Sequence, residues 1–241
     1  MKIKSHFLYT LGFLSILFLA QELHDWAHYI VAGVSCGCWG KKGFDNWTIC
    51  DRCAVSPNMG AIIFFAGPFV TYIIIWSAWW LMDRDHTSRQ RSVGFALLFA
   101  AVPFVRILAA FAGGGDETRC LRGVFQQTDG SNRHLIALAG LSIVLLLTIP
   151  PILRAFFLLS GWKERIFLFL IFLVLPLYVH QWILKGVMGK LLERGFLGTE
   201  ILPGIPVLVI VWTCSWAVIL TITFKKLTGL LRNQNEAMKS T

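Results

Sequence analysis

The sequence predicts an all-α integral membrane protein, a polytopic bundle of about six transmembrane helices. Of its 241 residues, 56% are hydrophobic and only 15% are charged, whereas a soluble domain carries roughly 25% charged residues. The mean hydropathy is +0.66, and several apolar runs reach the ~20 residues that a helix needs to cross a bilayer. Helices are expected because a single segment in lipid satisfies its backbone polar groups in no other way.

The apolar runs follow one another along the whole chain, so we interpret residues 1–241 as a single membrane domain. Residues 186–199 are expected to form a short interfacial helix, and the basic tail 225–241 is expected to end in disorder. The predicted spans are 7–34, 57–82, 93–113, 134–159 (interrupted by Pro150 and Pro151), 164–185 and 201–224.

The net charge of +9 does not indicate nucleic acid as a partner, because the Lys and Arg residues form no patch interleaved with aromatic residues. Positive loops in a membrane protein are explained by topology and by the anionic headgroups of the lipid bilayer. If both termini are cytoplasmic, twelve of the 22 Lys and Arg lie inside and nine outside, with Arg106 within a span. This difference favours cytoplasmic termini only slightly.

Four ionisable side chains lie within the first predicted span, in the segment "QELHDWAHYIVAG". Such groups cost several kcal/mol in lipid and mark functional sites. His24 and His28 are one helical turn apart, so they share a face and can bind one ion. Asp25 stands where the zincin motif His-Glu-x-x-His has its general base. The alternative is a hydrogen-bonded knot that joins helices without a metal.

A third ligand is required, because catalytic zinc takes three protein ligands and keeps one position open. Asp116 is the candidate, since it follows three glycines in "AAFAGGGDETR" directly after the third span. Glu117 is a reserve ligand or a group that orients one of the histidines. The alternative for Asp116 is a solvated loop carboxylate.

Two further polar residues lie within predicted spans. Arg106 is expected to pair with a carboxylate, because an unpaired Arg in a span is costly. Glu22 points away from His24 and is expected to pair with a basic group such as Arg106, rather than to bind metal. His180, near a helix end, is expected to be an interfacial anchor.

These segments resemble the site-2 protease-like family (peptidase M50 class) of intramembrane zinc metalloproteases. "HDWAHYIVAGVSCG" is similar to the family's first-span motif, and "FFAGPFVTYIII", with Gly67 and Pro68, to its Ala-Gly-Pro segment. The family's third ligand is an aspartate beside glycine, which corresponds to Asp116. The resemblance covers a core of about residues 7–120, and the spans within about 134–224 are additional.

The resemblance implies a Zn²⁺ cofactor held by His24, His28 and Asp116, and a membrane-embedded protein or peptide as substrate. Asp25 would act as general base, and Gly67 and Pro68 would shape the substrate groove. Two features depart from the family. Asp25 replaces the family's Glu and is one methylene shorter, and the family's cytosol-facing site, with the N-terminus outside, contradicts the charge count. The alternatives are a catalytically inactive membrane scaffold and, less favoured for lack of repeated halves, a transporter.

Four cysteines lie in one predicted loop with the spacing C-x-C-x11-C-x2-C. They are expected to bind a structural zinc if the loop is cytosolic, or to form disulfides if it lies outside. The charge count places this loop outside and therefore favours disulfides. The family topology places it in the cytosol and therefore favours zinc. The four residues are Cys36, Cys38, Cys50 and Cys53.

Overall fold

The computed structural model describes residues 2–3, 7–125, 132–159, 161–227 and 231–232, which form an all-α helical bundle. Six helical segments in these ranges are long and apolar enough to cross a membrane. The predicted fold class is confirmed. Most of the tail that was predicted to be disordered lies outside the described residues.

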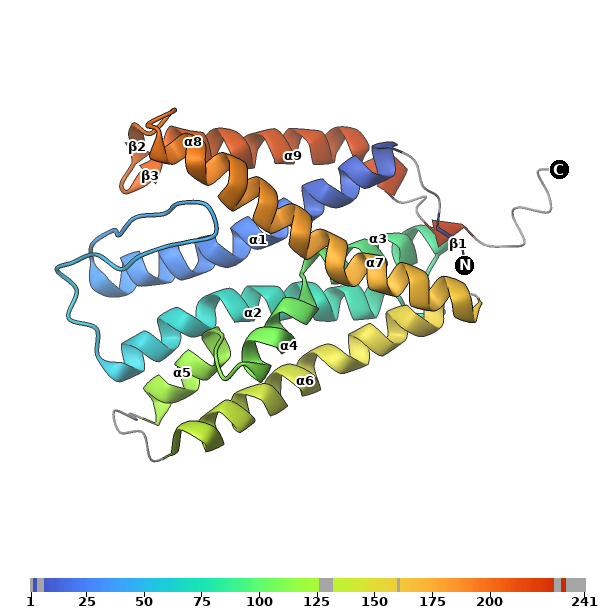
Figure 1. Cartoon of the computed structure of the whole chain (residues 1–241), viewed down its shortest axis with the longest axis horizontal. Helices are drawn as coiled ribbons and strands as arrows, with labels where there is room; N and C mark the ends of the chain where they lie inside the picture. The colour runs from blue at the N-terminus through green and yellow to red at the C-terminus, as the bar shows by residue number, and fades with distance from the viewer. Residues whose placement is uncertain (1, 4–6, 126–131, 160, 228–230, 233–241) are drawn as a thin grey trace.

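The bundle consists of nine α-helices in the described part of the chain (Figure 1). Their bounds are α1 Phe7–Cys36, α2 Pro57–Leu81, α3 Ser88–Ala100, α4 Pro103–Phe111, α5 Asp116–Val124, α6 Arg133–Leu158, α7 Trp162–Gln181, α8 Lys190–Glu193 and α9 Val207–Leu227.

Short non-α elements complete the described structure. A π-helix, Trp182–Gly189, continues α7 into α8, so the fifth apolar segment runs from Arg165 to Glu193. The interfacial helix predicted for 186–199 is therefore wrong. Two antiparallel strand pairs join β1 (Lys2–Ile3) to β4 (Leu231–Arg232), and β2 (Glu200–Leu202) to β3 (Ile205–Pro206).

Helix α1 lies inside the bundle, where it packs against α2, α3 and α9. Leu17, Phe95 and Phe99 are almost completely buried in the central hydrophobic cluster. Helices α6, α7 and α9 leave large apolar side chains exposed, including Phe157 and Leu170. An apolar exterior around a buried helix that carries a few ionisable residues is the arrangement expected of a bundle in lipid.

The predicted third span is broken into two helices. Helix α3 ends at Ala100, and α4 begins at Pro103, a residue that suits the first turn of a helix because it needs no N–H donor. Val102 between them adopts a left-handed conformation, with φ 47° and ψ 53°. In contrast, α6 continues through Pro150 and Pro151, where the sequence had suggested an interruption.

The two ends of the bundle differ in the segments that they carry (Figure 1). At one end lie the long loop 37–56, helix α5 and the β2–β3 hairpin; we call this the loop end. The β1–β4 pair lies at the opposite end, beside the ends of the chain. His24 and His28 lie about 12–18 Å from the loop-end terminus of α1 at Cys36, at 1.5 Å per residue.

Candidate metal centre

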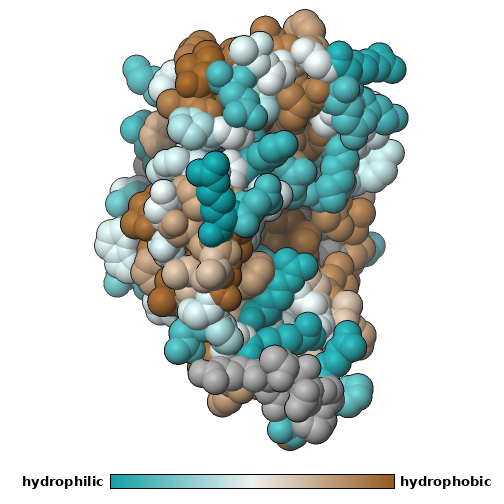
Figure 2. All heavy atoms as spheres, turned by 90° about the vertical axis from the view of Figure 1, so that its left-hand side faces the viewer, coloured by the Kyte–Doolittle hydropathy of each residue, from teal (hydrophilic) through white to brown (hydrophobic). Residues whose placement is uncertain are grey.

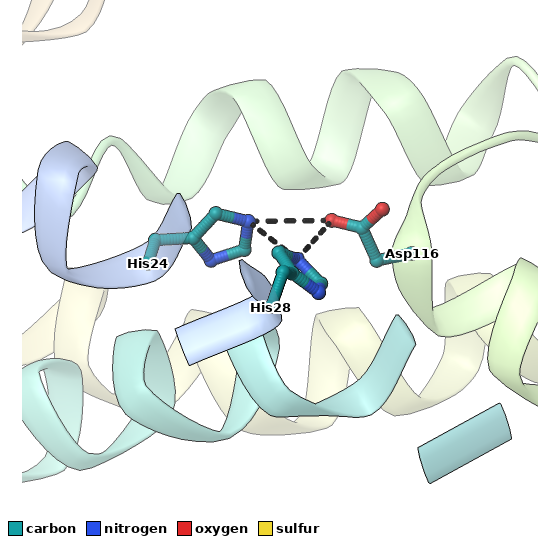
Figure 3. A group of neighbouring side chains, drawn as sticks. All are labelled: His24, His28 and Asp116. Atoms are coloured by element: carbon teal, nitrogen blue, oxygen red, sulfur yellow. Dashed lines mark hydrogen bonds and ion pairs between the residues drawn. The ribbon is translucent and has the colours of Figure 1, made fainter. Parts of the chain in front are cut away.

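Three side chains from two helices converge on one point near the loop end (Figure 3). The Nε2 atoms of His24 and His28 are 3.1 Å apart. Asp116 Oδ2 lies 3.4 Å from the first of these nitrogens and 3.5 Å from the second. The three residues predicted as ligands are thus brought together, and they form a group that could hold a metal ion.

The positions of the ligands follow from local structure. His24 and His28 share one face of α1 because they are four residues apart. Asp116 is the first residue of α5, and Gly115 before it has φ +86°, a conformation open to glycine at little cost. The glycine run therefore turns the chain so that the carboxylate meets the two imidazoles.

The ring of His28 is fixed on both sides. Its Nδ1 lies 2.7 Å from the carbonyl oxygen of Ile63 on α2, which can only accept a hydrogen bond. The proton therefore resides on Nδ1, and the lone pair of Nε2 faces His24 and Asp116. Trp47 of the 37–56 loop stacks on the ring, with centroids 4.7 Å apart and planes at 16°.

The ring of His24 is oriented by Thr71. Its Nδ1 is 3.0 Å from Thr71 Oγ1, which in turn donates to the carbonyl of Gly67 at 3.2 Å. With its own proton committed to that carbonyl, the hydroxyl accepts the proton of His24 Nδ1, which leaves Nε2 unprotonated. Both histidines therefore present a free lone pair to the same point, as metal ligation requires.

Gly67 provides the space for both rings. A Cβ atom at this position would overlap His28 Nε2 and His24 Cε1. The histidines therefore lie directly on the backbone of α2. Pro68 follows within the helix and cannot donate to the carbonyl four residues earlier. In the structure, Gly67 allows the two imidazoles to pack against α2. The expected role of Gly67 in a substrate groove stays a prediction.

Arg106 links the site to a second buried carboxylate. Its Nη1 donates to Glu117 Oε1 at 2.9 Å, and the Tyr72 hydroxyl donates to the same oxygen at 2.8 Å. Its Nη2 lies 2.7 Å from Nδ1 and 3.2 Å from Nε2 of His24. An atom this close to both ring nitrogens does not lie in the direction of the lone pair of either one. The predicted carboxylate partner of Arg106 exists, but it is Glu117.

Glu22 pairs with Lys42 instead. The two side chains are almost completely buried, and Lys42 Nζ lies 2.9 Å from Glu22 Oε2. The prediction that Glu22 pairs with a basic residue is therefore confirmed. The residue named for that role, Arg106, is wrong. Glu117 is engaged by Arg106 and Tyr72, so it lies outside the group formed by His24, His28 and Asp116.

Asp25 contacts the same lysine. Its Oδ2 lies 3.7 Å from Lys42 Nζ, and the residue lines the cavity that contains His24 and Asp116. That cavity has a volume of about 600 Å³ and is walled by α1, α4, α5 and residues 45–49 of the loop. Figure 2 shows the loop end, where hydrophilic side chains surround a hollow with an apolar floor.

The electrostatics of Asp116 suit a ligand. An aspartate carboxyl is anionic at neutral pH, the state in which carboxylates bind metals. Arg119, on the next turn of α5, lies 3.8 Å from Oδ1 and further favours the anion.

The loop cysteines form two disulfides, Cys36–Cys53 and Cys38–Cys50. The structure therefore has disulfides, one of the two alternatives that the sequence left open. The Cys38–Cys50 bond lies within the loop that the Cys36–Cys53 bond closes, so two disulfides close this loop at the end of α1. Cys120 and Cys214 are free.

Several residues at the site escaped sequence reasoning. Thr71 had a weak signal, since it lies four residues after Gly67 on the same helix face. Lys42 and Trp47 had none, because a loop carries no periodicity that predicts where its side chains pack. His180 is buried, at 4% exposure, and stacks on Phe18, so the prediction of an interfacial anchor is wrong.

Comparisons with protein-family models, with curated proteins and with solved structures find no match. The functional argument therefore rests on the residues of the site.

Proposed function

We propose that this chain is a zinc-dependent intramembrane peptidase of the site-2 protease-like type. The supporting observation is the convergence of His24 Nε2, His28 Nε2 and Asp116 Oδ2 within 3.1–3.5 Å of one another. Zinc–ligand bonds of 2.0–2.2 Å at tetrahedral angles separate ligand atoms by about 3.3–3.6 Å. The three atoms are therefore within a few tenths of an ångström of the spacing that zinc requires.

The donor set also favours zinc over harder cations. Two imidazoles and one carboxylate are typical of catalytic zinc sites, whereas magnesium and calcium prefer oxygen ligands alone. Both imidazoles have a backbone or hydroxyl partner on Nδ1, the arrangement that fixes metal-binding histidines. When bound, zinc supplies Lewis acidity and activates water for attack at neutral pH.

The chain's own residues would supply proton transfer and access. Asp25 would take a proton from the attacking water as its oxygen adds to the peptide carbonyl, and return it to the amine when the C–N bond breaks. Lys42 holds the Asp25 carboxylate at the cavity wall. The 600 Å³ cavity is large enough for a short stretch of unwound peptide and for water.

A metal-binding scaffold without peptidase activity is the second candidate. The observation that favours it is the ion pair of Asp25 with Lys42, because the ammonium competes with a catalytic water for the same carboxylate. The shorter reach of Asp, compared with Glu, points the same way.

Metal analysis tests the first part of the proposal. Purified protein should contain about one zinc per chain, and His24→Ala or His28→Ala should remove it. His134→Ala is the matched control, because His134 is exposed on α6. A metal-free wild-type protein that also fails to take up added zinc would contradict the proposal.

Cleavage of a membrane-embedded peptide tests the second part. Asp25→Asn should abolish cleavage with zinc retained, and Asp25→Glu should preserve or increase it. Zinc retained without any cleavage by the wild type or by Asp25→Glu would favour the scaffold.

A further inference from the structure

The 37–56 loop indicates which side of the membrane the metal site faces. Both disulfides lie at the loop end, where they tie this loop to the end of α1. Disulfides form and persist in oxidising compartments and are rare in the cytosol. We propose that the metal site opens to the oxidising, non-cytosolic side of the membrane, opposite to the cytosol-facing site that the family resemblance implies, and acts on peptide segments that are presented from that side.

Chain topology extends this assignment to the whole bundle. With six spans, successive connections alternate between the two sides. Connections 37–56, 112–132 and 194–206 then share the oxidising side. The short turns 82–87 and 159–164 lie on the cytosolic side, together with the β1–β4 pair.

The distribution of positive charge agrees with this orientation. Short cytosolic loops and the helix ends beside them are enriched in Lys and Arg. The 82–87 turn is bordered by Arg84, Arg89 and Arg91, and the 159–164 turn by Lys163 and Arg165. Over the whole chain the excess is only twelve Lys and Arg against nine, so the disulfides carry the assignment and the charges add little to it.

The cavity belongs to the oxidising side. Residues 45–49 of the loop form part of its wall, and Trp47 covers one face of His28. Lys42 anchors the loop beneath the surface through Glu22, and its backbone N–H donates to Gly204 beside the β2–β3 hairpin. Water and substrate therefore reach the ligands past a disulfide-closed loop, from the end of the bundle seen in Figure 2.

The side assignment stands independently of catalysis, whereas the class of substrate rests on the proposed function. The experiment therefore begins with labelling that needs no activity. The full chain, with Cys120→Ser and Cys214→Ser as background, receives either Arg194→Cys at the loop end or Arg84→Cys in the 82–87 turn. Both arginines are exposed, so the two variants are matched.

A membrane-impermeant maleimide is applied to sealed right-side-out and inverted vesicles. Arg194→Cys should react in right-side-out vesicles, and Arg84→Cys in inverted ones. The reverse pattern, or equal labelling of one position from both sides in sealed vesicles, would overturn the assignment.

A second measurement tests the disulfides on the unmodified chain. Unfolded protein should take up maleimide at two cysteines before reduction and at all six after reduction. Uptake at six without reduction would overturn the proposal. If labelling gives the expected pattern while zinc and cleavage are absent, the orientation stands and the peptidase proposal fails.

Discussion

Lys42 Nζ and Glu22 Oε2 form an ion pair, 2.9 Å long, between the disulfide-closed loop and the helix that carries the histidines. The side chain of Lys42 is completely buried, and its ammonium also donates to the Gly43 carbonyl at 3.0 Å. Asp25 Oδ2 lies 3.7 Å from the same ammonium, within ion-pair distance. The lysine therefore joins the loop to the helix that carries both acids.

Lys42→Met should destabilise the protein strongly, because it leaves Glu22 as an uncompensated buried carboxylate. Loss of one partner of a buried pair costs about 3–5 kcal/mol. The double variant Lys42→Met/Glu22→Gln should recover much of this loss. Thermal unfolding in detergent measures the effect, with exposed Lys41→Met as the control. Equal midpoints for Lys42→Met and Lys41→Met would contradict the burial of the pair.

Gly67→Ala should abolish zinc binding, because a methyl group there would displace both imidazoles from their positions on α2. Gly60→Ala on the same helix is the matched control, since a Cβ at that position meets only Val55 Cγ1, at 3.4 Å. Zinc content after purification reports the difference. Full zinc occupancy in Gly67→Ala would mean that the histidines are not seated against this glycine.

Thr71→Val should weaken zinc binding by about 10–100-fold, the usual effect of removing a partner that orients a ligating histidine. The change keeps the shape of the side chain but removes the acceptor for His24 Nδ1. Thr213→Val is the control, because that hydroxyl donates only within α9, to Val209. Competition with a chromogenic zinc chelator gives the affinities; identical values would exclude Thr71 as the orienting group.

Acid should remove one contribution to stability at the 82–87 turn. The hydrogen bond from Arg154 holds the pKa of Asp83 below its usual range. A carboxyl whose pKa is lower in the folded state stabilises the fold above its unfolded pKa of about 3.9, and this contribution is lost as the pH falls through the folded value. The midpoint difference between wild type and Asp83→Asn should therefore shrink below about pH 4. A difference unchanged across that range would show that the ion pair contributes nothing.

Sequence reasoning identified the parts of the site that depend on local geometry. The spacing of His24 and His28 fixes them on one helix face whatever surrounds that helix. Asp116 was found because a glycine run followed by a carboxylate is a local pattern. The six apolar segments were visible for the same reason, since each span satisfies its own backbone.

The remaining features depend on tertiary contacts. Four cysteines allow three pairings, and only the folded loop selects one. Arg106 was expected to pair with a carboxylate, and Glu22, Asp116 and Glu117 were all candidates. Only the packing of the helices shows that the partner is Glu117. Lys42 reaches Glu22 across a loop whose path no periodicity specifies.

The interruption at Val102 has a consequence for the interior of the bundle. Where α3 stops, the carbonyl of Ala100 loses its helical donor and accepts a hydrogen bond from Gln21 Nε2 at 3.2 Å. Ala101 and Val102 border the cavity directly. Uncoiled backbone at this depth is stable only against protein or water. The turn meets this requirement itself, because the N–H groups of Ala101 and Val102 donate to Leu97 and Phe99, and the Val102 carbonyl accepts from Val105.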